Sequence, residues 1–301
     1  MIADLHALTV PKKKETLSAN IHEMAASIMS CGFDQSKTAT LFLQSQVLGH
    51  TELAWILASL CQMKKLAHMP QWRDKVRKTS SSLNEPYPEN MSLGLFAYPV
   101  LMASDVLLFD TDEVPVGPDQ ITHLEITREL ARSFNNFYKT DSLKIPKIKV
   151  YDELKIYSLQ DPNSKMSKSD SNLRATISIL DPPDDIKHKI KRAQTDSLKS
   201  ISYDPKMRPG LSNLIRIYSN LKSISIEESL EQIGNKGKAE LKASLADSLI
   251  EHLSPIQKRY NKLIIETPEL VSETLKQGSL IANSRAQSKI KSVLDIIGCS
   301  L

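Results

Sequence analysis

The chain has 301 residues, 41% of them apolar and 25% charged, which is typical of a globular protein with one large domain or two ordinary ones. Its formal charge of +4 permits a nucleic-acid partner without requiring one. The sequence contains no run of about 18 apolar residues, which a membrane-spanning helix would need. The three cysteines, Cys31, Cys61 and Cys299, lack Cys-x-x-Cys spacing, so we expect reduced core thiols and no zinc site.

The N-terminal third of the chain begins with alternating strand-like and helical segments. Residues 1–10 predict a buried strand that ends in a polar turn. Apolar residues at helical spacing predict a helix over 17–28, and Gly32 stands where a helix C-terminus is expected. Residues 40–43 then predict a short buried strand.

The same alternation continues toward the middle of the chain. Residues 53–60 carry the apolar stripe of a helix, and residues 99–109 predict another helix beginning at Pro99. A short strand and turn follow at 114–117, and a further helix begins near Asp119. Strands alternating with helices predict a Rossmann-like α/β domain with a parallel sheet.

The second half of the chain differs in character from the first. A polar run at 161–172 precedes one strand-like piece at 175–180, and a helix start with two prolines and acidic residues follows at 181–185. From there the pattern is mainly helical. We therefore predict an α/β domain over 1–172 and a C-terminal α-helical domain over 173–301.

One polar loop between these predicted domains carries two lysines and two hydroxyl residues, in the string Lys165-Met166-Ser167-Lys168-Ser169. Lysine is a compact cation with three donors, which suits a mobile clamp on phosphate groups. A solvated basic loop is an equally good interpretation of the string by itself.

This string matches the KMSKS motif of class I aminoacyl-tRNA synthetases, and further segments resemble the tryptophanyl-tRNA synthetases. Residues 98–108 are similar to the stretch with the indole-reading aspartate. Residues 114–120 resemble the VPVGEDQ segment, with Pro118 where an acid is usual, and residues 4–10 resemble the DxHAxTV strand end. Residues 44–47, 50–51, 55–57 and 71–72 look closest to the mitochondrial branch of this family. The resemblance covers essentially the whole chain. It implies that 1–172 is an N-terminally incomplete domain that binds nucleotide and tryptophan, and that 173–301 binds the tRNA anticodon.

The resemblance implies an ATP-dependent activation of L-tryptophan to tryptophanyl-adenylate, followed by transfer to tRNA(Trp). Lys165 and Lys168 would serve the leaving pyrophosphate, with Lys75 as a weaker candidate, and Mg²⁺ would arrive on the ATP phosphates. The resemblance also implies a homodimer without membrane attachment. It places the chain in the mitochondrial matrix, or alternatively in a bacterial cytoplasm.

The resemblance further implies two groups of binding residues. The ATP-binding residues would be Gly117, Pro118, Asp119, Ile156, Lys165, Met166, Ser167, Lys168 and Ser169, and the tryptophan-binding residues would be Asp105, Gln120, Tyr98, Met102, Val116 and His6. Without the resemblance, Asp105 would be taken as a local helix contact, Met102 as core and His6 as structural. The lysines and arginine at 187–192 either face tRNA phosphates or form a solvated face.

One family motif is not found in this sequence. The family carries a segment similar to His-Ile-Gly-His before the strand that here begins at Met1, and this segment packs on ATP. We therefore expect an N-terminally incomplete chain. Three alternatives stay open: an active tryptophan enzyme, a catalytically impaired chain that binds only tRNA or a full-length partner, and a relative specific for tyrosine.

Overall fold

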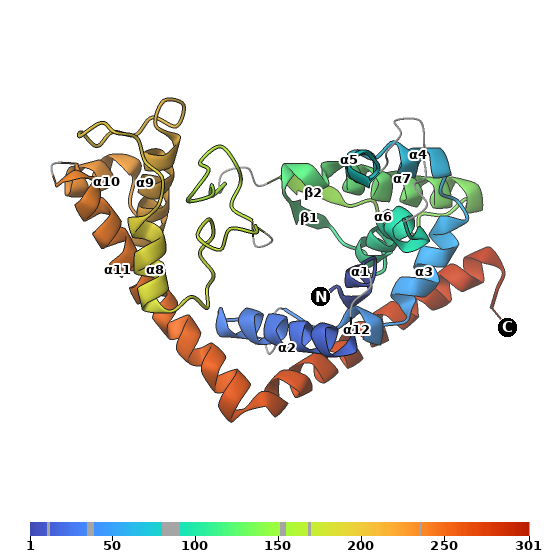
Figure 1. Ribbon diagram of the computed structural model, residues 1–301. Helices are drawn as coiled ribbons and strands as arrows, with labels where there is room; N and C mark the ends of the chain where they lie inside the picture. The colour runs from blue at the N-terminus through green and yellow to red at the C-terminus, as the bar shows by residue number, and fades with distance from the viewer. Residues whose placement is uncertain are drawn as a thin grey trace. The chain divides into compact units, whose positions relative to one another are not determined.

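The computed structural model describes residues 1–10, 13–34, 39–79, 91–150, 155–167, 170–234 and 236–300 (Figure 1). The chain divides into two compact units. The first unit is Met1–Asp152 together with Thr267–Leu301, and the second unit is Glu153–Glu266. The sequence predicted a single domain boundary near residue 172. The structure instead counts the last helix with the first unit. The assignment of separate functions to 1–172 and 173–301 stays a prediction.

Helices make up most of both units. The first unit contains α1 (Asp4–Ala7), α2 (Lys14–Ser30), α3 (Gly49–Ala58), α4 (Met63–Ala67), α5 (Pro70–Thr79), α6 (Leu93–Leu107), α7 (Ile121–Tyr138) and α12 (Pro268–Ile297), with short turns η1 (Gln44–Gln46) and η2 (Pro118–Gln120). The second unit contains α8 (Pro183–Lys191), α9 (Pro209–Lys222), α10 (Ile226–Ile233), α11 (Gly237–Asn261) and η3 (Lys262–Glu266). In the described part of the chain, no helix combines the length and apolar character of a membrane span.

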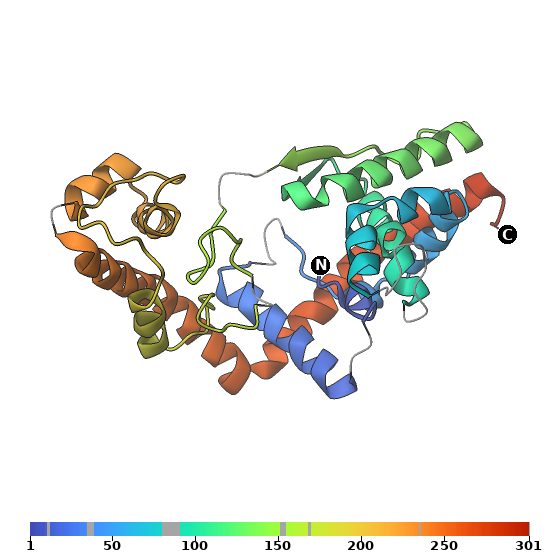
Figure 2. The ribbon, with the colours of Figure 1, turned by 45° about the horizontal axis from the view of Figure 1, so that its top comes forward.

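The strands of the first unit pair in parallel. Strand β1 (Glu113–Val116) lies beside β2 (Lys147–Val150), with Glu113 opposite Lys147 and Val116 opposite Val150. Helix α7 connects the two strands and packs on β2, and Figure 2 shows it running alongside them. This strand–helix–strand unit is the arrangement that parallel pairing requires, because its crossover needs a helix-length connection.

The predicted strand over residues 1–10 is wrong in extent. Only Ile2 pairs, as a single parallel bridge to Leu43. The chain then turns into α1 at Asp4, whose carboxylate accepts a hydrogen bond from the backbone N–H of Ser45 at 3.0 Å. This side-chain contact replaces the backbone pairing that a longer strand would have made.

The predicted start of a helix at Pro99 is also wrong. Helix α6 begins at Leu93, where the hydroxyl of Ser92 accepts a hydrogen bond from the N–H of Leu95 at 3.2 Å. Proline is therefore inside the helix, although it removes one N–H from the helical ladder. The hydrogen bond at Ser92 stabilises the observed start of the helix, so the preference of proline for the first helical turn does not determine where α6 begins.

The predicted strand at 175–180 does not form. The carbonyl of Ala175 accepts from the N–H of Leu159 at 2.9 Å, and its own N–H donates to Asn172 at 2.9 Å. These turn-like contacts satisfy the backbone of the segment without a neighbouring strand.

Several helix ends agree with the sequence. Helix α2 ends at Ser30, and Gly32 follows with a φ of +98°, a left-handed conformation that favours glycine. Helix α8 begins at Pro183, directly after the N-cap residue Pro182 and ahead of two aspartates, in agreement with the predicted helix start. The cysteines are free, but Cys31 and Cys299 are exposed beyond helix ends, so the prediction of core thiols is wrong for these two.

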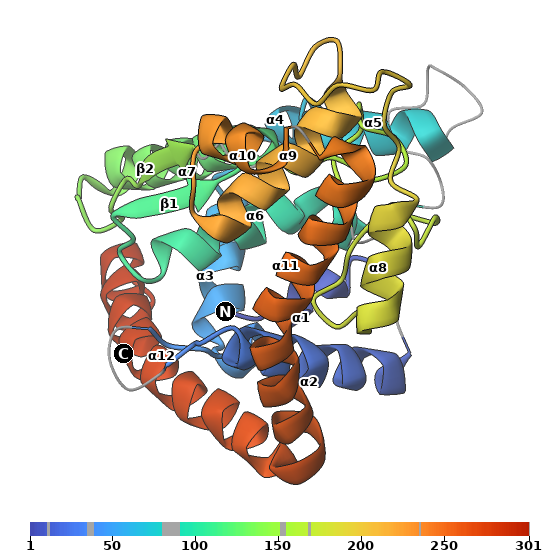
Figure 3. The ribbon, with the colours of Figure 1, turned by 90° about the vertical axis from the view of Figure 1, so that its left-hand side faces the viewer.

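Each unit has its own hydrophobic core. In the first unit, α3, α6, α7 and α12 bury residues such as Leu53, Leu107 and Phe134. In the second unit, α8 and α9 pack against α11, and Figure 3 shows α8 beside α11. Ile190 and Leu241 are fully buried at the centre of this second cluster.

Candidate functional site

The carboxylate of Asp105, in the last turn of α6, is surrounded by polar side chains of the first unit. Its Oδ2 lies 2.8 Å from Nε2 of His6, which comes from α1. Its Oδ1 accepts from Nε2 of Gln44 in η1 at 2.7 Å and lies 2.7 Å from Nδ1 of His50 in α3. Residues from four segments therefore converge on one carboxylate.

This cluster is largely removed from water. The side chain of Asp105 is 9% exposed, and those of Gln44 and His50 are fully buried. Burial opposes ionisation of Asp105, but the hydrogen bonds from His50 and His6 outweigh it, so the pKa of Asp105 lies below its ordinary value. The site thus presents an ionised carboxylate in a nearly dry environment, where a hydrogen bond to it is strong.

The same face of α6 carries two other predicted tryptophan-binding residues. Tyr98, Met102 and Asp105 follow one another at the i, i+4, i+7 spacing that places side chains on one face. The hydroxyl of Tyr98 lies 2.7 Å from Nε2 of His123 in α7, and burial raises the pKa of Tyr98. Burial lowers the pKa of His123, which favours its neutral imidazole.

The turn after β1 holds the predicted ribose and ammonium contacts. Val116 ends the strand, and Nε2 of Gln120 donates to Oδ2 of Asp119 at 3.1 Å. A Cβ at Gly117 would lie 2.8 Å from Oδ1 of Asp119, so glycine allows that carboxylate to approach the backbone. Pro118, at the position where the family usually has an acid, is the exposed first residue of η2.

One ring contact and one electrostatic interaction lead from the Asp105 cluster toward this turn. The rings of His6 and Tyr98 meet edge to face with centroids 6.3 Å apart. The negative charge of Asp119 acts on His123, which in turn contacts Tyr98. The structure therefore brings His6, Tyr98 and Asp105 together, with His123 between Tyr98 and the turn that carries Asp119, while the roles of these residues stay predictions.

Helix α5 carries Lys75, the weaker candidate for a phosphate contact. Gln71, one turn earlier on the same face, donates from Nε2 to the carbonyl oxygen of Asp119 at 2.7 Å. Lys75 is exposed on this helix. The contact fixes α5 against the turn after β1.

The Lys165 loop belongs to the second unit, where part of it is described. The N–H of Met166 donates to the carbonyl of Ile156 at 3.0 Å, so Ile156 and the residues 165–167 lie side by side. The amide of Asn213 on α9 holds the N–H and carbonyl of Tyr157 at 3.0 and 2.9 Å. Lys165 is exposed; Lys168 and Ser169 lie outside the described residues.

Four polar residues of these clusters were not predicted from the sequence: Gln44, His50, His123 and Asn213. One signal existed for Gln44, because it directly follows the apolar stretch 40–43, and ligand contacts gather at the carboxyl ends of parallel strands. No local pattern distinguishes the others. Among the described residues, no group of three or more His, Cys, Asp or Glu side chains is placed to hold a metal ion.

Comparison with known families gives an extensive match. The family described as class I tRNA synthetases for W and Y matches residues 1–254. The chain is 40% identical to the tryptophan–tRNA ligase of Bacillus anthracis, covering 99% of this chain and 87% of that protein. It is 41% identical to the corresponding ligase of Bacillus subtilis strain 168, with 99% and 86% covered.

Solved structures agree with the sequence match. The tryptophanyl-tRNA synthetase of Mycoplasma pneumoniae superposes with a TM-score of 0.85 at 31% identity, covering 99% of this chain and 87% of that one. The enzyme of Campylobacter jejuni, in complex with ADP and tryptophan, has a TM-score of 0.81 at 32% identity, with 99% and 88% covered. These likenesses confirm the predicted Rossmann-like α/β fold with an additional helical region.

Proposed function

The chain belongs to the class I tRNA synthetases, among the tryptophan–tRNA ligases, and from this membership we propose how its residues divide the reaction. It is a tryptophan–tRNA ligase, which uses ATP to join tryptophan to tRNA. The family membership decides between tryptophan and tyrosine, because the close relatives are ligases for tryptophan.

We assign indole recognition to Asp105. A carboxylate offers about four acceptor positions. Among the described residues, Gln44 and His50 contact Oδ1 and His6 contacts Oδ2, which leaves one position on Oδ2. Indole has one N–H donor, so a single vacant acceptor in a dry site matches it. Binding a substrate without that donor would leave the acceptor unpaired, which is costly.

We propose the remaining tryptophan and ATP contacts from the family resemblance together with the positions described above. Met102 and Val116 would flank the indole, and Tyr98 and Gln120 would hold the α-ammonium and carboxylate groups. The turn Gly117–Asp119 would contact the ribose, and Ile156 with the loop from Lys165 would contact adenine and phosphates. Lys165 and Lys168 would stabilise the charge on the leaving pyrophosphate, since phosphoryl transfer depends on positioned cations.

Magnesium would enter with ATP and neutralise phosphate charge as pyrophosphate departs. Among the described residues, Lys75 and Lys165 are exposed cations, and no group of acidic, histidine or cysteine side chains is placed to hold a metal ion. The location of the enzyme is a further proposal. The ligases of Bacillus anthracis and Bacillus subtilis are bacterial, which favours a bacterial cytoplasm. A mitochondrial matrix is supported by the likeness of residues 44–47, 50–51, 55–57 and 71–72 to that branch.

Charging of tRNA with labelled amino acid tests this function. The purified protein with ATP and Mg²⁺ should esterify tryptophan to a tRNA bearing the tryptophan anticodon, with kcat/KM at least about a hundredfold higher than for tyrosine, because specific pairing of buried polar groups gives large discrimination. Equal use of tyrosine, or no use of tryptophan, would overturn the proposal.

We also propose that the enzyme is a homodimer joined through α3. An apolar surface surrounds Trp55, which is 77% exposed, and Leu48, which is 68% exposed. Beside Trp55, a pocket of about 580 Å³ is lined by Ile56, Tyr138 and Leu294, among others. Exposed tryptophan next to an apolar pocket is characteristic of protein interfaces, and a second copy provides the same tryptophan for the same pocket.

Replacing Trp55 with glutamate should dissociate this dimer. Loss of a central aromatic contact typically costs 2 kcal/mol or more, so the dimer Kd should rise about thirtyfold or more. Sedimentation over a range of protein concentrations measures the Kd. The control is Met207→Glu, which changes an apolar side chain that is 79% exposed in the second unit. A monomeric wild-type protein, or an unchanged dimer in the Trp55 variant, would contradict the proposal.

A further inference from the structure

A groove in the second unit collects positive charge outside the site described above. It lies between α8 and α11, has a volume of about 640 Å³ and is lined by Lys187, Lys191, Lys238, Lys242 and Asp247. Three alanines of α11 form the remaining lining: Ala239, Ala243 and Ala246. Four lysines face one aspartate, so the groove has a strong excess of positive charge.

Two of these lysines have structural contacts that build the groove. The ammonium group of Lys242 donates to the carbonyl oxygens of Lys191 at 3.2 Å and Ala193 at 2.7 Å, where α8 ends. A cation at a helix C-terminus satisfies free carbonyl groups and the negative end of the helix dipole. Lys242 thereby joins α8 to α11. Burial, and then the charge of Lys238, lower its pKa.

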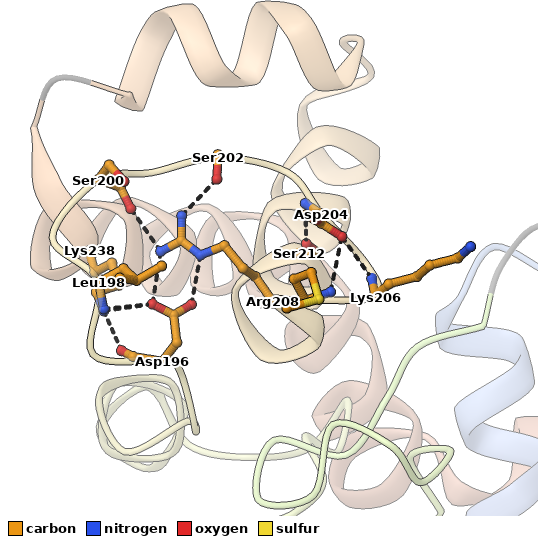
Figure 4. Close-up of polar contacts among 10 residues, drawn as sticks. Asp196, Leu198, Ser200, Ser202, Asp204, Lys206, Arg208, Ser212 and Lys238 are labelled. Atoms are coloured by element: carbon orange, nitrogen blue, oxygen red, sulfur yellow. Dashed lines mark hydrogen bonds and ion pairs between the residues drawn. The ribbon is translucent and has the colours of Figure 1, made fainter.

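Lys238 fixes the other end of the groove. Its ammonium group contacts the carbonyl oxygen of Asp196 and lies 3.5 Å from its carboxylate, which is bound by Arg208 through two hydrogen bonds of 2.8 Å (Figure 4). Because Arg208 already compensates the charge of Asp196, this carboxylate cancels little of the positive charge of Lys238. The groove keeps its positive potential.

The other two lysines are available for a ligand. Lys187 and Lys191 are exposed and lie one turn apart on α8, and among the described residues neither has an ion-pair partner. Lys189, between them, differs, because it is bound to Asp181 at 2.6 Å and is largely buried. Of the basic residues at 187–192, the structure therefore directs two into the groove and one into an internal ion pair.

We propose that this groove binds the sugar-phosphate backbone of tRNA, a proposal that rests on the tRNA-charging function above. Lys187 and Lys191 are separated by about 6 Å along the helix, so they can contact different phosphates. Three alanines leave room for the backbone to approach α11. Contacts to phosphates supply affinity and position without reading sequence.

Direct binding of tRNA separates this proposal from the charging function. The double variant Lys187→Gln/Lys191→Gln should bind a tRNA transcript with the tryptophan anticodon roughly ten- to a hundredfold more weakly at about 0.1 M salt, because two phosphate contacts are lost. The slope of log affinity against log salt should become shallower by about 1.5 to 2. Fluorescence anisotropy with end-labelled tRNA measures both quantities.

Two further variants act as controls. Lys222→Gln/Lys258→Gln removes the same charge elsewhere in the second unit; Lys258 lies about 160° around α11 from Lys242, at about 100° per residue. This control should leave the slope nearly unchanged, and Lys187→Arg/Lys191→Arg should keep wild-type binding. If the glutamine variant binds like wild type, the groove proposal is overturned and the function is not. If wild-type protein fails to bind tRNA, both are overturned.

Discussion

Replacing Asp105 with asparagine is expected to lower kcat/KM for tryptophan roughly ten- to a hundredfold, while KM for ATP stays near its wild-type value. A buried hydrogen bond to a charged group contributes about 1.5–3 kcal/mol, and the amide loses that charge. The carboxylate of Asp105 only accepts hydrogen bonds. The asparagine amide carries an NH₂ group with two donor hydrogens, and these would face Gln44, His6 or His50 in place of an acceptor. Charging assays at varied tryptophan and ATP measure the two effects separately.

The control for this variant is Asp112→Asn, which changes an exposed carboxylate of the same unit that pairs with Lys144. It should keep wild-type kinetics for both substrates. An equal loss for ATP and tryptophan in the Asp105 variant would indicate general damage to the fold, and would contradict a specific role in recognition.

Replacing Asp196 with alanine is expected to destabilise the second unit by about 3 kcal/mol, the low end of the range for breaking a buried ion pair. Arg208 is 5% exposed, and its guanidinium binds Asp196, Ser202 and the carbonyl of Ser200 (Figure 4). Without Asp196, a buried positive charge loses its partner. The low end applies because Asp196 itself is 23% exposed.

Urea unfolding followed by far-ultraviolet circular dichroism measures this loss. The double variant Asp196→Ala/Arg208→Met should recover part of the stability, because an apolar side chain leaves no buried charge unpaired. Asp247→Ala, which removes an exposed carboxylate on α11, should change stability by less than about 0.5 kcal/mol. A single variant as stable as wild type would contradict the account of this ion pair.

The effect of Asp196 should also depend on pH. The hydrogen bond from Arg208 holds the pKa of Asp196 below its ordinary value. The stabilisation is therefore complete above the unfolded-state pKa of about 3.9 and decreases as pH falls from there toward the folded-state pKa. The difference between wild type and Asp196→Ala should be constant from about pH 5 to 7 and smaller near pH 3.

The sequence correctly predicted those elements whose formation depends on residues close together in the chain. Helix α2 with Gly32, strand β1 and the start of α8 each depend on neighbouring residues, and these agree with the structure. The strand expected over 1–10 is reduced to a single bridge at Ile2, and the strand expected over 175–180 does not form, because each strand residue requires a backbone partner. Sequence patterns indicate that a segment can be extended, but they do not indicate whether a neighbour is available.

The candidate site was also only partly predictable from the sequence. Asp105 could be singled out through the family resemblance, whereas its partners Gln44 and His50 come from segments far away in the chain. Asn213 similarly holds Tyr157 across a long separation in sequence. Such contacts depend on the tertiary arrangement, so a single sequence without its fold does not reveal them.

The most direct test of indole recognition compares tryptophan with its benzothienyl analogue, in which sulfur replaces the indole N–H. Charging kinetics of both substrates, with wild type and Asp105→Asn, form a thermodynamic cycle. Wild type should prefer tryptophan by about ten- to a hundredfold, corresponding to about 1.5–3 kcal/mol, and the variant should lose most of this preference. If Asp105→Asn weakens both substrates equally, the carboxylate does not read the indole N–H and the central claim is wrong.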